Sequence, residues 1–214
     1  MYDFHCHTTM SDGELLPTEL IRRMAVLGYT EMAISDHADF SNVRELIRAE
    51  EAVKRSAELY GVRLYAGIEI THVPPDQIDE LARYAKGLGA EVVVVHGETV
   101  TEPVAPGTNA AALSSAYVDI LAHPGLITDE DTRLAARNSV LLEITSRGGH
   151  NRTNGHVLSA ARRAGADVVI QSDAHGPGDL MSEHMRYLVA RGAGMNEEET
   201  KSVLSQTFDS LFSS

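Results

Sequence analysis

Four consecutive valines stand in the stretch Glu91-Val92-Val93-Val94-Val95-His96-Gly97. A β-branched run without polar alternation is typical of a strand that is buried on both faces, as strands of parallel sheets are. The segment before it, Pro75–Leu88, has helical periodicity and a proline in its first turn, where proline is tolerated. The stretch therefore predicts a buried strand that follows a helix.

The same order recurs on both sides of this stretch. Candidate strands are Met1–His7, Glu31–Asp36, Arg63–Ile70, Glu91–His96, Val118–His123, Ser139–Ile144 and Asp167–Ser172. Candidate helices are Pro17–Leu27, Asn42–Tyr60, Pro75–Leu88, Asp129–Asn138, Asn154–Ala164, Asp179–Arg191 and Asn196–Phe212. Strands separated by helices predict βαβ units and a parallel sheet.

The number of these units predicts the architecture. Seven strand and helix units fit into 214 residues without a Pro/Gly/Ser linker or a change in composition, so residues 1–214 are expected to form one α/β domain. A closed or nearly closed (β/α) barrel suits this pattern, with an open doubly wound sheet as the alternative.

Composition and charge exclude several classes of protein. The chain has 18 Lys and Arg against 31 Asp and Glu, and a net charge of −13 disfavours long nucleic acids and anionic membranes. The longest aliphatic run, Val92–Val95, is far shorter than the roughly 20 residues that span a bilayer. A single cysteine, Cys6, and an N-terminus without an apolar segment indicate a cytoplasmic protein. Small barrels of this length often self-associate, so a homo-oligomer is considered, although no exposed apolar seam is legible in the sequence.

The predicted strands end in histidine and carboxylate side chains. These are His5 and His7, Asp36-His37, Glu69, His96, His123, and Asp173 with His175. A single histidine at a strand end is more often a hydrogen-bonded loop residue, but the carboxyl ends of barrel strands meet at one mouth. Without cations, such a cluster would leave imidazoles unpaired at roughly 1–3 kcal/mol each. Imidazole and carboxylate without thiolate suit Zn, Mn or Fe, and the number of ligands implies two or three divalent ions.

An ordered set of motifs resembles the PHP (polymerase and histidinol phosphatase) family. The motifs are His5-Cys6-His7-Thr8-Thr9-Met10-Ser11-Asp12-Gly13, Ser35-Asp36-His37, Gly67-Ile68-Glu69, His96, Ala122-His123-Pro124 and Ser172-Asp173-Ala174-His175. They span residues 1 to about 180, nearly the whole chain. The resemblance implies a distorted seven-stranded, TIM-like (β/α)7 barrel with a trinuclear metal site.

The resemblance also implies which residues hold the three ions. The first ion would take His5, His7, Glu69 and Asp173; the second, Glu69 as a bridge with His96 and His123; the third, Asp12, His37 and His175. Asp12 stands where some members of the family have a histidine, which bears on the strength and metal selectivity of the third site. No ligand position is empty.

Such a site is expected to hydrolyse a small phosphomonoester, similar to histidinol phosphate. A hydroxide bridging two ions would attack phosphorus, and the ions would neutralise charge on the other phosphoryl oxygens. Glu69 would act as the bridge, and His37 or His175, or a water held there, would protonate the leaving alkoxide.

The segment from Glu143 to Asn154 follows the sixth predicted strand and could recognise the substrate. Arg147 and Arg152 are the candidates for phosphate binding, although both could be solvated loop arginines. Glu143 is a candidate acceptor that orients a metal-bound histidine. Four histidines match no ligand motif and are expected on the surface or in loops, with His150 also considered for substrate contact: His72, His150, His156 and His184.

Three classes of function stay open. A metal-dependent phosphomonoesterase is favoured, with a nuclease of short oligonucleotides as a narrower rival. A second class hydrolyses another bond, such as an amide, with similar metals. A third uses the ions only to stabilise the barrel. P-loop, nucleophile-elbow, dinucleotide-binding and Cys-x-x-Cys motifs are all missing from the sequence.

Overall fold

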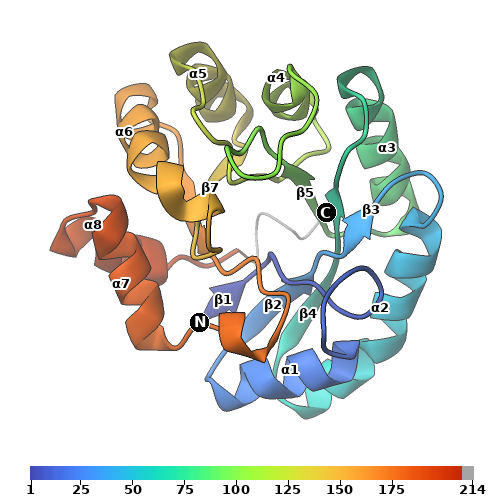
Figure 1. The fold of residues 1–214 in the computed structure, drawn as a ribbon. Helices are drawn as coiled ribbons and strands as arrows, with labels where there is room; N and C mark the ends of the chain where they lie inside the picture. Colours follow the sequence, from blue (N-terminus) through green and yellow to red (C-terminus); the bar gives the residue numbers. More distant parts are fainter. Residues whose placement is uncertain (209–214) are drawn as a thin grey trace.

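A computed structural model describes residues 1–208 and places parallel strands inside a ring of helices (Figure 1). The strands are β1 Tyr2–Asp3, β2 Glu31–Ile34, β3 His37–Ala38, β4 Arg63–Ile70, β5 Val92–His96, β6 Ile120–Ala122, β7 Leu141–Thr145 and β8 Val168–Gln171. Their order is β1-β2-β4-β5-β6-β7-β8, and β3 pairs with β4. The expected distorted, nearly closed barrel of seven parallel strands is confirmed, and the open doubly wound alternative is wrong.

The predicted second strand is interrupted between β2 and β3. The predicted strand Glu31–Asp36 ends at Ile34, and His37 then pairs with Glu69 on β4 as a separate short strand. The first strand is also shorter than Met1–His7, because only Tyr2 and Asp3 pair with β2. Both deviations fall where ligand-bearing side chains leave the regular ladder.

The helices cover the outside of the sheet. They are α1 Pro17–Val26, α2 Val43–Leu59, α3 Pro75–Leu88, α4 Thr108–Ser114, α5 Asp129–Asn138, α6 Asn154–Ala164, α7 Glu183–Ala193 and α8 Glu197–Leu204, with 3-10 turns η1 His150–Thr153 and η2 Pro177–Asp179. Helix α4 was not predicted. Helix α7 begins after Ser182, whose hydroxyl accepts a hydrogen bond from the Met185 amide, and not at Asp179. The predicted helix Asn196–Phe212 ends earlier, at Leu204, and Phe212 itself lies outside the described residues.

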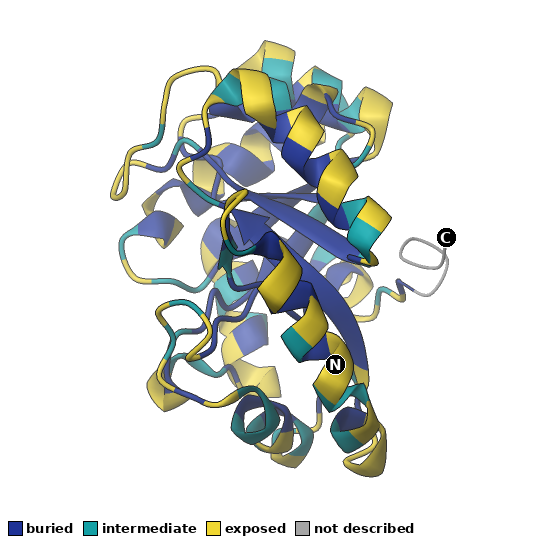
Figure 2. Cartoon of the chain, turned by 90° about the vertical axis from the view of Figure 1, so that its right-hand side faces the viewer, coloured by how far each residue is buried: buried dark blue, intermediate teal, exposed yellow. Residues whose placement is uncertain are grey.

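The four valines of β5 illustrate how the barrel is packed. Val92 and Val94 belong to the interior cluster with Phe4 and Tyr65, while the alternate residues of the strand pack beneath the helices. Figure 2 shows the same division, with buried strands and helices that are exposed on their outer faces. His96 continues the inward face of β5, so alternation carries its side chain into the barrel mouth. No helix in the described chain is long and apolar enough to cross a membrane.

Candidate metal centre

All nine predicted ligands converge at the carboxyl ends of the strands. Their nitrogen and oxygen atoms form four overlapping groups, within each of which the candidate ligand atoms lie within 4.8 Å of one another. The groups are His7-Asp12-His37-His175, His5-His123-Asp173, His5-His7-Glu69 and Glu69-His96-His123. The structure thus brings the nine together, and their binding of metal remains a prediction.

Glu69 stands at the centre of this cluster. Its Oε1 lies 3.3 Å from His5 Nε2 and 3.2 Å from His96 Nδ1, and its Oε2 lies 2.7 Å from His37 Nδ1. The carboxylate is fully buried near the end of β4. Burial alone would raise the pKa of Glu69, but the surrounding imidazoles, led by His5, lower it well below its usual value. One buried carboxylate therefore faces ligands from several strands, as a bridge requires.

Asp173 faces the same cluster from the end of β8. Its Oδ1 lies 3.3 Å from His7 Nε2, and its Oδ2 lies 3.6 Å from His123 Nε2. Asp173 and His123 both have positive φ angles, 53° and 27°. A left-handed backbone is costly for residues with a side chain, and such strain concentrates at functional sites. The strands therefore turn sharply where these two side chains enter the mouth.

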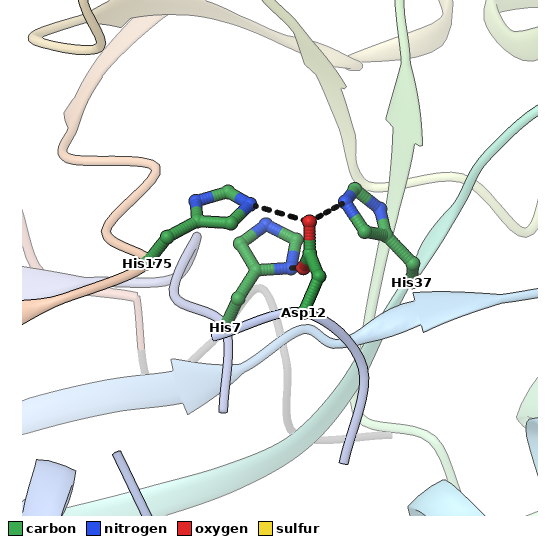
Figure 3. Close-up of side chains that lie close together, drawn as sticks. All are labelled: His7, Asp12, His37 and His175. Carbon is green, nitrogen blue, oxygen red and sulfur yellow. Dashed lines mark ion pairs between the residues drawn. The ribbon is translucent and has the colours of Figure 1, made fainter. Parts of the chain in front are cut away.

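Asp12 reaches the centre from the turn after β1 (Figure 3). Its Oδ2 lies 3.3 Å from His175 Nε2 and 3.5 Å from His37 Nε2. Contacts with His175 and then His37 lower the pKa of Asp12 well below its usual range. The Asp12 side chain is 54% exposed, whereas His5 and His7 are fully buried. The group that contains Asp12, His37 and His175 is thus the one that opens to solvent.

Outer partners fix several of the imidazoles. His5 Nδ1 lies 2.8 Å from Glu143 Oε2, which leaves Nε2 directed at Glu69 and Asp173. His96 Nε2 lies 3.3 Å from the main-chain oxygen of Glu102, which leaves Nδ1 directed at Glu69. A ring nitrogen that donates to an oxygen directs the other nitrogen to a metal, an arrangement common around metal ligands. The sequence suggested Glu143; Glu102 acts through its backbone and gave no side-chain signal.

A tight turn from Thr8 to Gly13 positions Asp12. Asp36 accepts hydrogen bonds from the Thr8 amide at 2.7 Å, the Thr8 hydroxyl at 2.6 Å and the Ser11 hydroxyl at 2.5 Å. A Cβ on Gly13 would lie 2.6 Å from the main-chain carbon and oxygen of His7. Asp36 was recognised only as part of a motif, and the structure gives it the role of anchoring this turn.

The donor set fits divalent cations. Buried ligand atoms without a hydrogen-bond partner include His5 Nε2, both ring nitrogens of His7, Glu69 Oε1 and His96 Nδ1. Leaving so many buried polar atoms unpaired would be costly, whereas coordination would satisfy them together. Imidazole and carboxylate oxygen are ligands that Zn, Mn and Fe accept. The chemistry of these residues therefore fits divalent cations.

Two of the three predicted substrate-binding residues do not face this cluster. Arg147 Nη1 lies 3.1 Å from Asp179 Oδ2, and the same oxygen accepts hydrogen bonds from the His175 and Gly176 amides. Arg152 is exposed and lines a groove beside α7 with Met185. Arg147 thus supports the loop that carries His175.

His150 lies against the centre. It is 6% exposed, its ring centroid is 4.3 Å from that of His123, and its Nδ1 is buried without a hydrogen-bond partner. His150 lies in the loop after β7, as one of the two expected positions has it, but it is buried and not on the surface. The three other unassigned histidines are exposed: His72, His156 and His184.

The fold and the cluster together define a class of protein. A parallel β/α barrel whose strand ends supply imidazoles around a shared buried carboxylate is the arrangement of a metal-dependent enzyme. The PHP domain family model matches residues 3–212, and the chain belongs to this family.

The comparisons extend across nearly the whole chain. It is 48% identical over 205 residues to an uncharacterized protein of Methanocaldococcus jannaschii, covering 95% of this chain and 94% of that protein. It is 25% identical to the DNA polymerase/3'-5' exonuclease PolX of Bacillus subtilis, covering 95% of this chain but only 38% of PolX. A solved Bacteroides vulgatus protein, described as containing a PHP-like metal-dependent phosphoesterase, has a similar fold, with a TM-score of 0.53 at 16% identity over 95% of this chain and 61% of that one.

Proposed function

We propose that this metal-dependent phosphoesterase of the PHP family hydrolyses a small phosphomonoester, with an alcohol part similar to that of histidinol phosphate. The observation that carries the proposal is the convergence of nine imidazole and carboxylate side chains around Glu69, with buried ligand atoms that have no other partner. A dianionic phosphate suits a cluster of cations, because phosphoryl transfer depends mainly on charge neutralisation and positioning.

Three sets of ligands would hold the ions. His5, His7, Glu69 and Asp173 would hold the first, Glu69 with His96 and His123 the second, and Asp12 with His37 and His175 the third. When bound, the ions supply a nucleophilic oxygen at neutral pH and neutralise negative charge on the phosphoryl group. The carboxylate of Glu69 keeps the first two groups together, and Glu143 and the Glu102 carbonyl fix the orientation of His5 and His96.

His37 or His175, which both face solvent, would deliver the proton to the leaving oxygen. The side chains of His37 and His175 are 24% and 15% exposed, whereas the His96 side chain is 2% exposed. The leaving alkoxide must depart toward solvent, so His175 or His37, or a water that they hold, is placed to protonate it. Burial works against the proton on His37, but Glu69 and Asp12 raise its pKa to about 10 in the metal-free protein. Metal binding at His37 therefore competes with a proton.

Substrate contact is assigned to His150. Its buried Nδ1 has no partner and its ring lies beside His123, whereas Arg147 is engaged by Asp179. A hydrogen bond from His150 to a phosphoryl oxygen would satisfy the orphaned nitrogen. We expect His150→Ala to raise KM for the monoester more than it lowers kcat, because this contact exists in the ground state as well as in the transition state.

A panel of four esters tests the proposal: histidinol phosphate, p-nitrophenyl phosphate, a phosphate bis-ester and a dinucleotide. Chelated enzyme reloaded separately with Mn, Zn, Fe and Mg is assayed for release of phosphate or nucleotide. Release from histidinol phosphate well above the generic monoester supports the proposal. Bound ions with no product from any ester would indicate that the enzyme hydrolyses a different kind of bond.

Hydrolysis of short oligonucleotides is the second candidate. It is favoured by the similarity to PolX and by 41% identity over 70 residues to a 5'-3' exoribonuclease of Haemophilus influenzae, a match that covers 33% of this chain and 23% of that protein. The net charge of −13 disfavours a long polymer but not a dinucleotide. Faster turnover of the dinucleotide than of any monoester would select this candidate.

A further inference from the structure

The loops after β5 and β6 meet where the main-chain ladder between these strands ends. The last pair of the ladder is His96 with Ala122, and the Gly97 amide then donates to the Ala122 carbonyl at 3.1 Å. His123 follows directly, and its φ angle of 27° turns the chain sharply out of the strand. Two proposed ligands, His96 and His123, therefore stand at the edge of the regular sheet, and the segments after them need other contacts to fix them.

The two loops pack main chain against main chain beside these ligands. A Cβ on Gly97 would clash with the main-chain oxygen of Ala122, and a Cβ on Gly125 would clash with the main-chain oxygen of Glu98. Glycine is the residue that permits such a close approach. The position of one loop is therefore tied to the position of the other.

Asn109, in the first turn of α4, bonds to both loops. It is 3% exposed, its Oδ1 accepts a hydrogen bond from the Glu98 amide at 2.9 Å, and its Nδ2 donates to the Pro124 carbonyl at 2.9 Å. The side-chain amide offers one acceptor and one donor group, and each has its partner. Because Glu98 lies two residues after His96 and Pro124 directly follows His123, one buried side chain joins the main chain beside both ligands.

Glu98 returns the bond to Asn109. Glu98 Oε1 accepts hydrogen bonds from the Gly107 amide at 2.9 Å and from the Asn109 amide at 3.0 Å, so each side chain binds the main-chain amide of the other residue. The loop that they enclose carries Glu102, whose carbonyl oxygen lies 3.3 Å from His96 Nε2. Fixing both ends of the loop therefore restricts the Glu102 carbonyl, and with it the ring orientation of His96.

We propose that Glu98 and Asn109 form a clasp that positions His96 and His123 for the second ion. The inference rests on the metal centre proposed above and adds two positioning residues to it. Apart from Glu69, the other ligands come from β3 and from the segments after β1 and β8, which the hydrogen bonds of the clasp do not reach. Opening the clasp should therefore weaken one ion and spare the others.

Asn138 provides a matched control on the same helix. Its Nδ2 donates to the Leu113 carbonyl at 2.7 Å, near the end of α4 that lies opposite Asn109. Asn138→Ala thus removes an asparagine and its hydrogen bond to the main chain of α4, and leaves the loops at the mouth untouched. Glu98→Gln is a second control, because an amide oxygen can accept the same hydrogen bonds without a charge.

The experiment compares Asn109→Ala, Glu98→Ala, Glu98→Gln and Asn138→Ala with the wild-type full chain. Apoprotein is titrated with Mn²⁺ and with Co²⁺, the bound ions are counted by mass spectrometry, and the Co²⁺ absorption spectrum reports coordination. We expect Asn109→Ala and Glu98→Ala to weaken the same ion by about 10-fold, the lower end of the range for residues that support metal ligands, and to change its spectrum. Glu98→Gln and Asn138→Ala should leave all affinities unchanged.

Hydrogen exchange of the metal-free proteins tests the clasp without metals. The amides of Gly97 and Glu98 should exchange faster in Asn109→Ala than in wild type, and Asn138→Ala should not change them. If Asn109→Ala does not fold, Glu98→Ala takes its place in the titration, and exchange of the Gly107 amide, which loses its acceptor, takes the place of the other two.

Equal weakening of all ions would overturn the clasp as a positioning device, and so would unchanged affinities, whether or not exchange becomes faster. A wild-type protein that binds no ion would overturn the proposed function. In that case the exchange of the Gly97 and Glu98 amides would still decide whether the clasp joins the two loops.

Discussion

Glu69 is the residue on which the centre depends most. It contacts imidazoles that come from the segment after β1, from β3 and from β5, and it is fully buried. Glu69→Gln keeps the size of the side chain but replaces one bridging oxygen by a donor that cannot coordinate. We expect loss of at least one ion and a fall in kcat/KM of about 100-fold, with weak residual activity, measured with metal content in the same samples.

His184→Ala is the control for this variant. His184 is exposed on α7 and matches no ligand motif, so its removal should change activity and metal content little. A Glu69→Gln enzyme with full activity and a full complement of ions would contradict the assigned centre.

The buried hydroxyl of Tyr2 should make the stability of the fold depend on pH, independently of metal binding. Its hydroxyl donates to the Val203 carbonyl at 2.8 Å, and burial raises the pKa of Tyr2 from 10 to about 12. A folded-state pKa above the unfolded one gives stability that is present below about pH 10 and lost as the pH rises through about 12. Between about pH 8 and about pH 11, wild type should lose about 1.4 kcal/mol more unfolding free energy than Tyr2→Phe.

Urea unfolding of the two metal-free proteins at both pH values measures this difference. At about pH 8, Tyr2→Phe should be less stable by about 1 kcal/mol, because the Val203 carbonyl loses its donor. Parallel losses in the two proteins on raising the pH would show that Tyr2 does not carry the effect.

Among the helices and strands, the sequence correctly predicted those that have a clear hydrophobic periodicity and clear residue signals at their ends. The long strand β4 and the helices α3, α5 and α6 have the predicted bounds, since each combines a strong pattern with clear termination. Helix α4 was missed because it is a seven-residue helix within a loop. The break between β2 and β3 was missed because it depends on register with β4 rather than on local propensity.

The sequence predicted those residues of the candidate site that lie at the ends of strands. Alternation and barrel geometry were sufficient to bring His96 and Glu69 to one mouth. Contacts that depend on loop conformation were not predictable: the pairing of Arg147 with Asp179 and the burial of His150 arise from turns after β7 and β8. Sequence proximity to the mouth does not specify which loop side chains face it.

The role of the turn from Thr8 to Gly13 can be tested by replacing Gly13. A methyl group at position 13 would lie 2.6 Å from main-chain atoms of His7 and 2.7 Å from the Thr8 amide, so the turn that carries Asp12 must move. We expect Gly13→Ala to lose the third ion, retain the second, and destabilise the fold by about 1–3 kcal/mol. Metal counting and urea unfolding measure both effects.

Gly87→Ala is the matched control. Position 87 is exposed within α3, and a methyl group there meets nothing within 4 Å. This variant should keep all ions and gain about 0.4–1 kcal/mol, because alanine restricts the unfolded chain. Retention of every ion by Gly13→Ala would argue against the role assigned to the turn.

At the scale of the whole molecule, the ions should stabilise the barrel, because their ligands come from strands all around its mouth. An ion present at about 100 times its Kd adds about 2.7 kcal/mol to the unfolding free energy. For a chain of this size that corresponds to a rise in Tm of about 5–10 °C for each ion. Calorimetry before and after chelation measures it, and an unchanged Tm would contradict metal binding across the strands.

The most direct test of a metal-dependent phosphomonoesterase is a titration of chelated protein with metal in which bound ions and phosphate release are followed together. We expect hydrolysis of a small phosphomonoester to rise with the number of ions, to reach a plateau at two to three ions per chain, and to be lower by about 100-fold in Glu69→Gln at every metal concentration. Two to three bound ions with no phosphate from any ester, or phosphate release that does not depend on metal, would contradict this function.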